Sequence, residues 1–162
     1  MDVYAAVIGT RKPDQNQILM ATEVIRWLNV RNVIIRTGGA VGIDHLAMRL
    51  ATRLEVYIPW PGYNKTLIPS HAKIYCAQDT SLYRDKWFAS VYKYHPNPIA
   101  LTNGARHLHA RNYPIVDGVI MVNAFPDERG EGGTGQGIRI AKDLNIPLFE
   151  YRRGKTIVKH LE

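Results

Sequence analysis

The sequence has one cysteine among its 162 residues, Cys76. A single cysteine excludes an internal disulfide and a cluster of thiolate metal ligands, and it is typical of proteins from a reducing compartment. No apolar run approaches the roughly 18 to 20 residues of a membrane-spanning helix, and no basic segment precedes the first apolar run. We therefore expect a cytoplasmic protein that has no membrane partner.

Blocks of like charge are also missing. The 21 Lys and Arg residues outnumber the 14 Asp and Glu residues and give a net charge of +7, but they are scattered rather than gathered in a basic tail. An excess of this kind favours an anionic partner such as a nucleotide, a nucleic acid or another phosphate-bearing ligand. A solvated basic surface is the simpler alternative.

No internal repeat or linker divides the chain. With 46% hydrophobic and 22% charged residues, the composition is ordinary for a globular protein, and the length suits one domain with a substantial core. We predict a single domain over residues 1–162.

Short apolar runs alternate with helical patterns, which is typical of an α/β protein. The first run is followed by apolar positions at helical spacing from Ile18 to Leu28, with Asp14 or Asn16 as the N-cap. Two strand–helix units and a third strand predict a mostly parallel, three-layer Rossmann-like fold with helices on both faces of the sheet. The expected strands are 3–8, 33–35, 56–59, 119–122 and 146–149, and 156–158 is either an edge strand or a frayed tail. The later helices have apolar positions at Ile43, Leu46, Ala47, Leu50 and Leu54, and at Ile138, Ala141 and Leu144.

The central motif is a glycine turn, 36–44, between the second strand and the second helix. Gly38 and Gly39 let the backbone approach a ligand with no Cβ in the way, and a helix that starts near Val41 presents free N–H groups and a positive dipole end. These features favour a phosphate site. A purely structural left-handed turn is the alternative.

Two other stretches carry similar chemistry at strand ends. Gly9, Thr10 and Arg11 place a glycine, a hydroxyl and a guanidinium directly after the first strand. Residues 131–137 are expected to form a second glycine-rich loop between a strand and a helix. In a doubly wound sheet such loops meet in one crevice at the carboxyl ends of the strands. The expected ligand-binding residues are Gly9, Thr10, Arg11, Gly38, Gly39, Ala40, Asp44, Arg111, Gly132, Gly133, Thr134 and Gly135.

Residues 60–98 interrupt the alternation and are predicted to form an aromatic, largely helical insert. Aromatic and basic side chains interleave there, a combination that stacks bases and holds phosphates. However, Tyr83, Trp87, Val91 and Tyr94 recur at helical spacing, which favours a helix that packs this stripe on the sheet. We predict that the insert forms a lid or a side wall.

His107 and His109 lie two positions apart, which directs them to different faces of a helix and makes them a poor metal pair. We expect neither a metal site nor a cofactor. Arg111 ends the same helix and is expected at the crevice, where its guanidinium would take a phosphate in bidentate fashion. The alternative is an arginine that bonds the last carbonyls of its own helix.

Together these residues resemble the superfamily of Rossmann-like nucleotide-binding proteins that includes the DNA-processing protein A domain and the "lonely guy" phosphoribohydrolases. The resemblance rests on Val7-Ile8-Gly9-Thr10-Arg11, Gly38-Gly39-Ala40-Val41-Gly42-Ile43-Asp44, Arg111-Asn112 and Gly132-Gly133-Thr134-Gly135. It covers nearly the whole chain apart from 60–98 and the tail. The resemblance is to the DNA-processing branch in two places: the motif from Gly38 to Asp44 with Ala47 after it, and the pair Arg111-Asn112. The resemblance implies a nucleotide ligand and a homo-oligomer.

Two positions depart from the pattern. The phosphoribohydrolase branch has a catalytic glutamate after the late glycine motif, where this chain has Arg139, so the carboxylate expected at the ribosyl carbon is lost. The DNA-processing branch usually has a histidine where this chain has Met48. The chain resembles the ligand-binding domain of the superfamily without its additional domains.

Three functions are compatible with these features. The first is the binding of a nucleotide, or of the phosphates of single-stranded DNA, in the crevice. The second is hydrolysis of a nucleotide N-glycosidic bond, with Asp44, Glu131 or Asp117 as the carboxylate, although Asp44 also suits the first turn of a helix for reasons of charge alone. The third is an oligomeric structural or partner-binding role in which the aromatic insert forms an interface.

Overall fold

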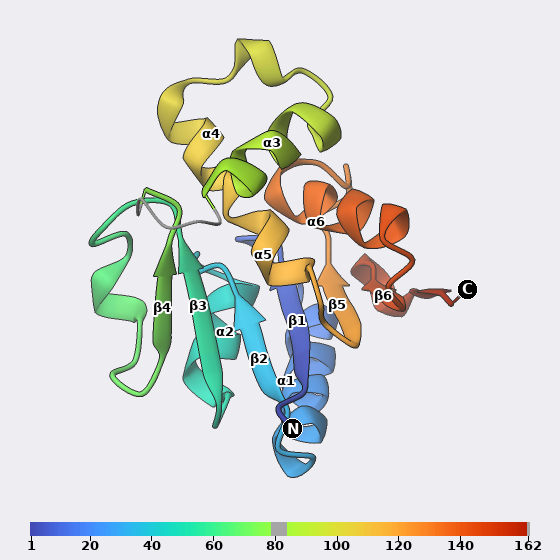
Figure 1. Cartoon of the computed structure of the whole chain (residues 1–162). Coiled ribbons are helices and arrows are strands. Elements are labelled where there is room, and N and C mark those ends of the chain that lie inside the picture. The colour runs from blue at the N-terminus through green and yellow to red at the C-terminus, as the bar shows by residue number, and fades with distance from the viewer. Residues whose placement is uncertain (79–83, 162) are drawn as a thin grey trace.

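The computed structural model describes residues 1–78 and 84–161. Within them, seven strands form one sheet in the order β4-β3-β2-β1-β5-β6-β7, parallel throughout except for the β6–β7 pair (Figure 1). The strands are β1 (Tyr4–Gly9), β2 (Ile34–Thr37), β3 (Leu54–Ile58), β4 (Lys73–Cys76), β5 (Met121–Phe125), β6 (Leu148–Tyr151) and β7 (Ile157–His160). The α/β, Rossmann-like architecture is confirmed.

Helices cover both faces of the sheet, as the sequence predicts. The helices are α1 (Gln15–Val30), α2 (Ile43–Leu50), α3 (Arg84–Tyr94), α4 (Asn103–Ala110), α5 (Asn112–Val116) and α6 (Gly132–Asp143), with short 3-10 turns η1 (Lys65–Leu67), η2 (Pro98–Ala100) and η3 (Arg153–Lys155). In Figure 1, α1 and α2 lie behind the sheet and α5 and α6 lie in front of it. Alternate residues of β1 feed the two cores: Ala5 and Val7 join the α1–α2 side, and Ala6 and Ile8 join the α5–α6 side.

The first helix shows how local sequence sets the position of the loops. Asp14 is the N-cap of α1, and its carboxylate accepts the N–H of Gln17 at 2.8 Å in a capping box. The buried Gln17 amide then donates to the carbonyls of Pro126 and Tyr151, at 2.8 and 2.9 Å. The start of α1 is thereby fixed to the segments that follow β5 and β6. None of the described helices is long and apolar enough to cross a membrane.

Two predicted boundaries are wrong. The second helix ends at Leu50, because Ala51 adopts an extended conformation and Leu54 already begins β3. Leu54 fits the helical spacing only because the strand that it begins is also buried. The strand expected at 119–122 is β5, which runs from Met121 to Phe125.

The predicted insert, 60–98, is less helical than expected. Its first half contributes β4, which pairs with β3 and extends the sheet, and α3 makes up much of its second half. The expected apolar stripe is present in α3: Trp87, Val91 and Tyr94 are buried in the core against the sheet. Tyr83 lies outside the described residues. The stripe is therefore core rather than an exposed interface.

The edge strand expected in the tail is present as β7. It pairs antiparallel with β6, so that Glu150 faces Val158 and Phe149 faces Lys159. The antiparallel return carries the tail back along the sheet from the carboxyl end of β6. The turn before it, η3, lies beside the beginning of α1.

Candidate functional site

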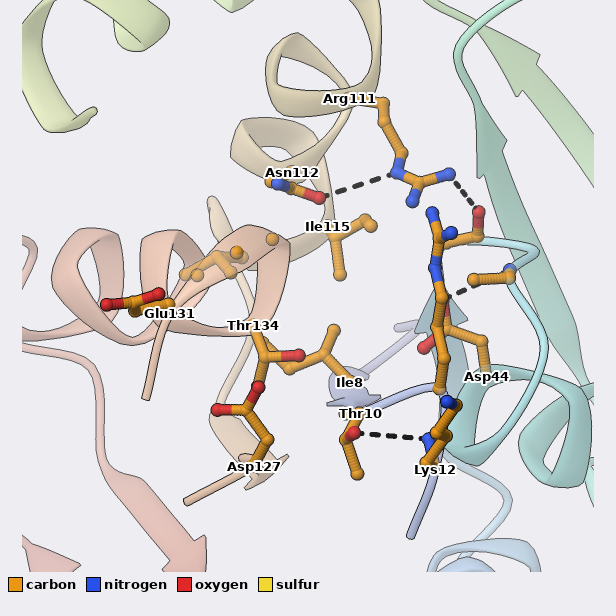
Figure 2. A pocket seen from close by; sticks show the side chains of 18 of the residues that line it. Ile8, Thr10, Lys12, Asp44, Arg111, Asn112, Ile115, Asp127, Glu131 and Thr134 are labelled. Carbon is orange, nitrogen blue, oxygen red and sulfur yellow. Dashed lines mark hydrogen bonds between the residues drawn. The ribbon is translucent and has the colours of Figure 1, made fainter. Parts of the chain in front are cut away.

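The loops after the central strands enclose a cavity of about 390 Å³. It opens at the carboxyl ends of β1 and β2, the position where parallel sheets of this type bind ligands. Figure 2 shows Arg111, Asp44 and Lys12 on one side and Thr134, Glu131 and Asp127 on the other. The lining residues are Ile8, Gly9, Thr10, Arg11, Lys12, Gly38, Ala40, Asp44, Arg111, Asn112, Ile115, Val116, Asp127, Glu131, Gly132, Gly133, Thr134, Gly137 and Arg153.

Most of the predicted ligand-binding residues line this pocket. Those that do are Gly9, Thr10, Arg11, Gly38, Ala40, Asp44, Arg111, Gly132, Gly133 and Thr134, together with the catalytic candidate Glu131. Gly39, Gly135 and Asp117 do not line it. The structure thus brings the three motifs to one place, and their ligand contacts remain a prediction.

The glycines after β2 are required by packing and by the backbone. A Cβ on Gly38 would lie 2.9 Å from the Asp44 carboxylate and 3.1 Å from the Arg111 guanidinium carbon, so both side chains pack closely against this glycine. Gly39 has a φ of +75°, and its Cβ would lie 3.1 Å from Val56. Gly39 therefore has reasons to be glycine that do not involve a ligand.

The start of α2 also differs from the sequence-based expectation. The helix begins at Ile43 rather than near Val41, with Gly42 as the N-cap at a φ of +82°. The Ile43 N–H donates to the Thr10 carbonyl at 3.2 Å. One of the N–H groups expected to face a phosphate is therefore occupied by the loop after β1.

Arg111 joins the two halves of the pocket. It lies at the junction of α4 and α5, is 7% exposed, and donates to the carbonyls of Gly38 and of Tyr57, the latter at 3.4 Å. Its Nε donates to the Asn112 side-chain oxygen at 3.4 Å (Figure 2). The side chain reaches across to the ends of β2 and β3, so the alternative in which it bonds its own helix is wrong.

Asp44 is part of the same buried unit. Its carboxylate accepts the Ala40 N–H at 3.2 Å and is 5% exposed. Burial raises the pKa of Asp44, and the Arg111 guanidinium opposes that rise. The carboxylate holds the turn before α2, and it also lies in the first turn of that helix, where the charge-based alternative expects it.

The second glycine-rich stretch is a helix rather than a loop. Helix α6 starts at Gly132, so Gly133, Gly135 and Gly137 lie in its first turns. A Cβ on Gly137 would lie 2.5 Å from Ile8, which shows that this glycine lets α6 pack directly on β1. A Cβ on Gly133 would lie 3.3 Å from the Asn112 side-chain nitrogen inside the pocket.

Asn112 has one hydrogen-bonding group without a partner. The residue is 7% exposed, and its oxygen accepts from Arg111, but its Nδ2 has no hydrogen bond within the described part of the chain. A buried amide donor without a partner is costly and is rare in folded proteins. Asn112 lines the pocket, and this unpaired donor lies beside Gly133 in the pocket wall.

The charges of the pocket are arranged asymmetrically. Arg11 and Lys12 follow β1, and neither forms an ion pair with any described residue. On the α6 side, one oxygen of Asp127 accepts the N–H groups of Arg129 and Gly130 at 3.0 and 2.8 Å, and the other oxygen has no hydrogen bond to a described residue. The Thr10 hydroxyl accepts the Lys12 N–H at 3.1 Å and retains its own proton for a ligand.

Comparison with known proteins decides the family. A family model described as DNA recombination-mediator protein A matches residues 2–86, more than half of the chain. The chain belongs to this family. No curated protein matches the sequence.

Two solved structures share the fold. DNA processing protein A from Helicobacter pylori, whose single-stranded DNA binding mode has been described, is 20% identical, with a TM-score of 0.66 over 95% of this chain and 68% of that one. The Moco carrier protein from Chlamydomonas reinhardtii is 16% identical, with a TM-score of 0.57 over 93% and 76% of the two chains. At these identities the likeness concerns the fold alone.

Met48 and Arg139, the two positions that depart from the superfamily pattern, have physical explanations. Met48 is fully buried in the core beside α1, where a histidine would lose its hydration. Arg139 lies away from the pocket, and its Nε donates to the Tyr94 carbonyl at 2.8 Å. It fastens α6 to α3 rather than acting on a ligand.

Asp117 is not a candidate for catalysis in this pocket. It precedes β5 and therefore lies toward the amino end of the sheet, where its carbonyl accepts from Arg36 at 2.8 Å and its carboxylate pairs with Lys86 at 3.3 Å. Among residues 1–78 and 84–161, no group of three or more His, Cys, Asp or Glu side chains is placed to hold a metal ion.

Four polar or charged pocket residues were among neither the predicted ligand contacts nor the catalytic candidates: Lys12, Asn112, Asp127 and Arg153. Lys12 and Asn112 are direct neighbours of predicted residues, so their positions could have been included. Arg153 reaches the pocket only because the tail turns back at η3, and no sequence signal shows that contact. Asp127 depends on the conformation of the loop after β5.

Proposed function

We infer that the chain binds the phosphate of a nucleotide, free or as part of single-stranded DNA, in the pocket between α6 and the loop after β1. Membership of the DNA recombination-mediator protein A family supports a nucleic-acid ligand. The Helicobacter pylori protein with the same fold is described as binding single-stranded DNA. A cavity of about 390 Å³ is large enough for one nucleotide unit.

The free donor of Asn112 is the observation that carries this proposal. Arg111 donates to the Asn112 oxygen and so fixes which end of the amide remains available. The Nδ2 group lies beside Gly133, in the first turn of the 12-residue helix α6. The helix N-cap, Glu131, makes no capping bond with its side chain. An anion at this point would receive the amide donor, free helix N–H groups and the positive helix dipole.

The pocket wall opposite α6 carries positively charged side chains, which suit a negatively charged ligand. Burial lowers the pKa of the Arg111 guanidinium, the Asp44 carboxylate opposes that change, and Arg11 adds a smaller lowering. Because Asp44 already balances the charge of Arg111, Arg11, which forms no ion pair with any described residue, is the cation left for an anion. Thr10 adds a hydroxyl between these cations and α6. Together these groups can surround a phosphate from both walls.

The test is an Asn112→Asp variant, which keeps the shape of the side chain but replaces the donor with a carboxylate. Binding is measured by fluorescence anisotropy with labelled dT20 and by titration calorimetry with dTMP. We expect affinity to fall by on the order of tenfold or more, since hydrogen bonds to charged groups contribute about 1.5 to 3 kcal/mol. A thermal melt checks that the variant remains folded, because the new carboxylate is buried although it can still accept from Arg111.

Asn103→Asp is the matched control. Asn103 is exposed at the first position of α4, does not line the pocket and undergoes the same change of charge. An Asn112→Asp protein that binds both ligands like the control would refute the phosphate site. Chromatography of the dTMP samples adds a second readout, because the appearance of free thymine would replace simple binding with N-glycosidic hydrolysis.

A further inference from the structure

Helix α1 has large apolar side chains on both of its sides. Its inner side packs in the core behind the sheet (Figure 1). On its outer side, Leu19, Trp27 and Val30 have exposed fractions of 55%, 47% and 83%. Single exposed apolar residues are common on protein surfaces, but several on one face are typical of an interaction surface. The outer side of α1 is therefore a candidate for contact with another protein.

Four exposed residues form a row along this outer side: Leu19, Glu23, Arg26 and Val30. Their spacings of four, three and four positions place them on one line over about three helical turns. The row reads apolar, acidic, basic and apolar. Read from the other end, it has the same spacing and the same apolar ends, with the two charges exchanged.

The two charged residues of the row have no ionic partner within the described part of the protein. Glu23 and Arg26 lie one helical turn apart, yet neither forms an ion pair with the other or with any other described residue. Both side chains are exposed. The row thus presents an unpaired carboxylate and an unpaired guanidinium between two apolar side chains.

A second copy of the chain would match this row. If two α1 helices pack antiparallel about a two-fold axis, Leu19 of each copy contacts Val30 of the other. In the same arrangement Glu23 of each copy contacts Arg26 of the other. Every contact is then made twice, as in an isologous interface between identical subunits. A parallel pair would instead place like charges together, which is unfavourable.

Trp27 lies beside the row, and its ring is held in position. The Arg31 guanidinium stacks over the Trp27 ring, 3.8 Å from its centroid, and donates to the Trp27 carbonyl at 3.1 Å. Tryptophan and arginine are enriched in protein interfaces, and a side chain that is already ordered loses less entropy on association. Trp27 is therefore suited to contact a partner that covers the row.

We propose that two copies of the chain associate through an antiparallel pair of α1 helices, with the row from Leu19 to Val30 at the centre of the contact. One pair of helices is a small interface, so the dimer is weak and forms at high protein concentration. No residue of the row lines the nucleotide pocket. The proposal is therefore independent of the proposed function.

The experiment exchanges the two charges one at a time. Sedimentation equilibrium is measured at up to about 1 mM for the unaltered protein, Glu23→Arg, Arg26→Glu and an equal mixture of the two variants. The mass of the unaltered protein should rise from 18.4 kDa toward twice that value with concentration. Each variant alone faces itself with two pairs of like charges, so its dissociation constant should increase about tenfold or more. In the mixture both ion pairs are restored with reversed direction, and the dimer should return.

Lys142→Glu is the matched control for Arg26→Glu. Lys142 is exposed on α6, on the other face of the sheet, and undergoes the same change of charge (Figure 1). This variant should dimerise like the unaltered protein. A mass of 18.4 kDa at every concentration of the unaltered protein would overturn the proposal. Charge variants of α1 that each dimerise like Lys142→Glu would also overturn it, because the dimer would then use another surface. A mixture that stays monomeric would rule out the antiparallel pair.

Discussion

The glycines after β2 and the glycines at the start of α6 lie on opposite walls of one pocket, and they are glycine for different reasons. After β2, Gly39 and Gly42 have positive φ angles, and the side chains of Asp44 and Arg111 pack closely against Gly38. In α6, Gly132 also has a positive φ, but at the later glycines the constraint comes from close approach: Gly137 contacts β1, and Gly133 faces the Asn112 amide. The first wall is a rigid backbone turn, and the second is a helix end that remains open toward a ligand.

This difference separates stability from binding. Substitutions in the first wall should act mainly on folding, because its hydrogen-bonding groups are used by the protein itself, as in the bond from Ala40 to Asp44. Substitutions at Gly133 should act mainly on affinity, because its neighbour Asn112 has a free donor. The predictions below test that separation, from the largest expected effect to the smallest.

The largest effect should come from Arg111→Met. This change leaves the buried Asp44 carboxylate without its nearby cation and removes the donors to the Gly38 and Tyr57 carbonyls. Breaking a buried charge pair on one side costs about 3 to 5 kcal/mol. We expect the free energy of unfolding, measured by urea denaturation, to fall by that amount. Arg111→Lys keeps the positive charge but not the planar guanidinium with its several donors, and should lower the free energy of unfolding by about 1 to 3 kcal/mol. Equal losses in the two variants would show that charge balance with Asp44 is unimportant.

Gly42→Ala should be the next most damaging. Gly42 and Gly118 have nearly the same φ, +82° and +81°, but a Cβ on Gly42 would lie 2.3 Å from the Thr10 carbonyl oxygen, whereas nothing lies within 4 Å of one on Gly118. Gly118→Ala therefore measures the backbone cost alone, about 1 kcal/mol. Gly42→Ala should lose a further 1 to 3 kcal/mol or so, the usual cost of overpacking. Chemical denaturation of the pair tests this, and similar losses would argue against a tight junction there.

A pair of alanine variants tests the separation directly. Gly39→Ala should lower the free energy of unfolding by about 1 kcal/mol or more because of its φ of +75°, and should leave the affinity for dT20 unchanged. Gly133→Ala has no such φ and should keep or gain stability, by up to about 1 kcal/mol, while affinity falls because the new Cβ lies 3.3 Å from the Asn112 nitrogen. Thermal melts beside anisotropy titrations give both readouts. The reverse pattern would exchange the roles assigned to the two walls.

The smallest predicted effect concerns His109, which holds α6 through a hydrogen bond. The Gln136 side chain donates to the His109 carbonyl at 3.2 Å, and burial lowers the pKa of His109 to about 4, with the His95 ring adding to the shift. Because the unfolded chain binds this proton more tightly, His109 costs stability as the pH falls from about 6.5 to 4, and has no effect above that range. Since the ring is partly exposed, we expect about 1 kcal/mol.

His109→Gln should remove that dependence. Asp44 has the opposite effect on stability, because its raised pKa means that the folded state binds its proton more tightly. Only the difference between His109→Gln and the unaltered protein therefore isolates His109. Melts at pH 7 and pH 4.5 measure it. A difference that stays the same at both pH values would show that His109 is not buried as a neutral ring.

The order of elements was predictable because strand and helix periods are local properties of the sequence. The apolar run before Gly9, the Asp14 cap and the burial of Trp87 all follow from residues a few positions apart. Strand β4 was missed because Lys73 and Ile74, at the sheet edge, are exposed and lack the pattern of a buried strand. The sequence predicts that α6 starts after its glycines because glycine disfavours helix interiors, and packing on Ile8 overrides that preference.

The site was predictable in outline for the same reason. Parallel strands carry their following loops to one edge, so Thr10, Gly38 and Thr134 could be brought together from sequence. What could not be predicted is how each side chain is used. The contact between Arg111 and the Gly38 carbonyl spans more than seventy residues of sequence, and the approach of Arg153 to Lys12 spans more than a hundred.

The central position of β1 has a consequence for how the chain folds. One side of β1 pairs with β2, and the other waits for β5, with Ala5 opposite Met121. As the chain is synthesised, the first half of the sheet emerges with an unpaired, apolar edge at Ala5 to Ile8 and with one wall of the pocket missing. Such distant pairing slows folding, and an open edge of this kind invites association with other chains. We expect a fragment that ends near residue 86 to aggregate rather than fold, even though the family match lies within it.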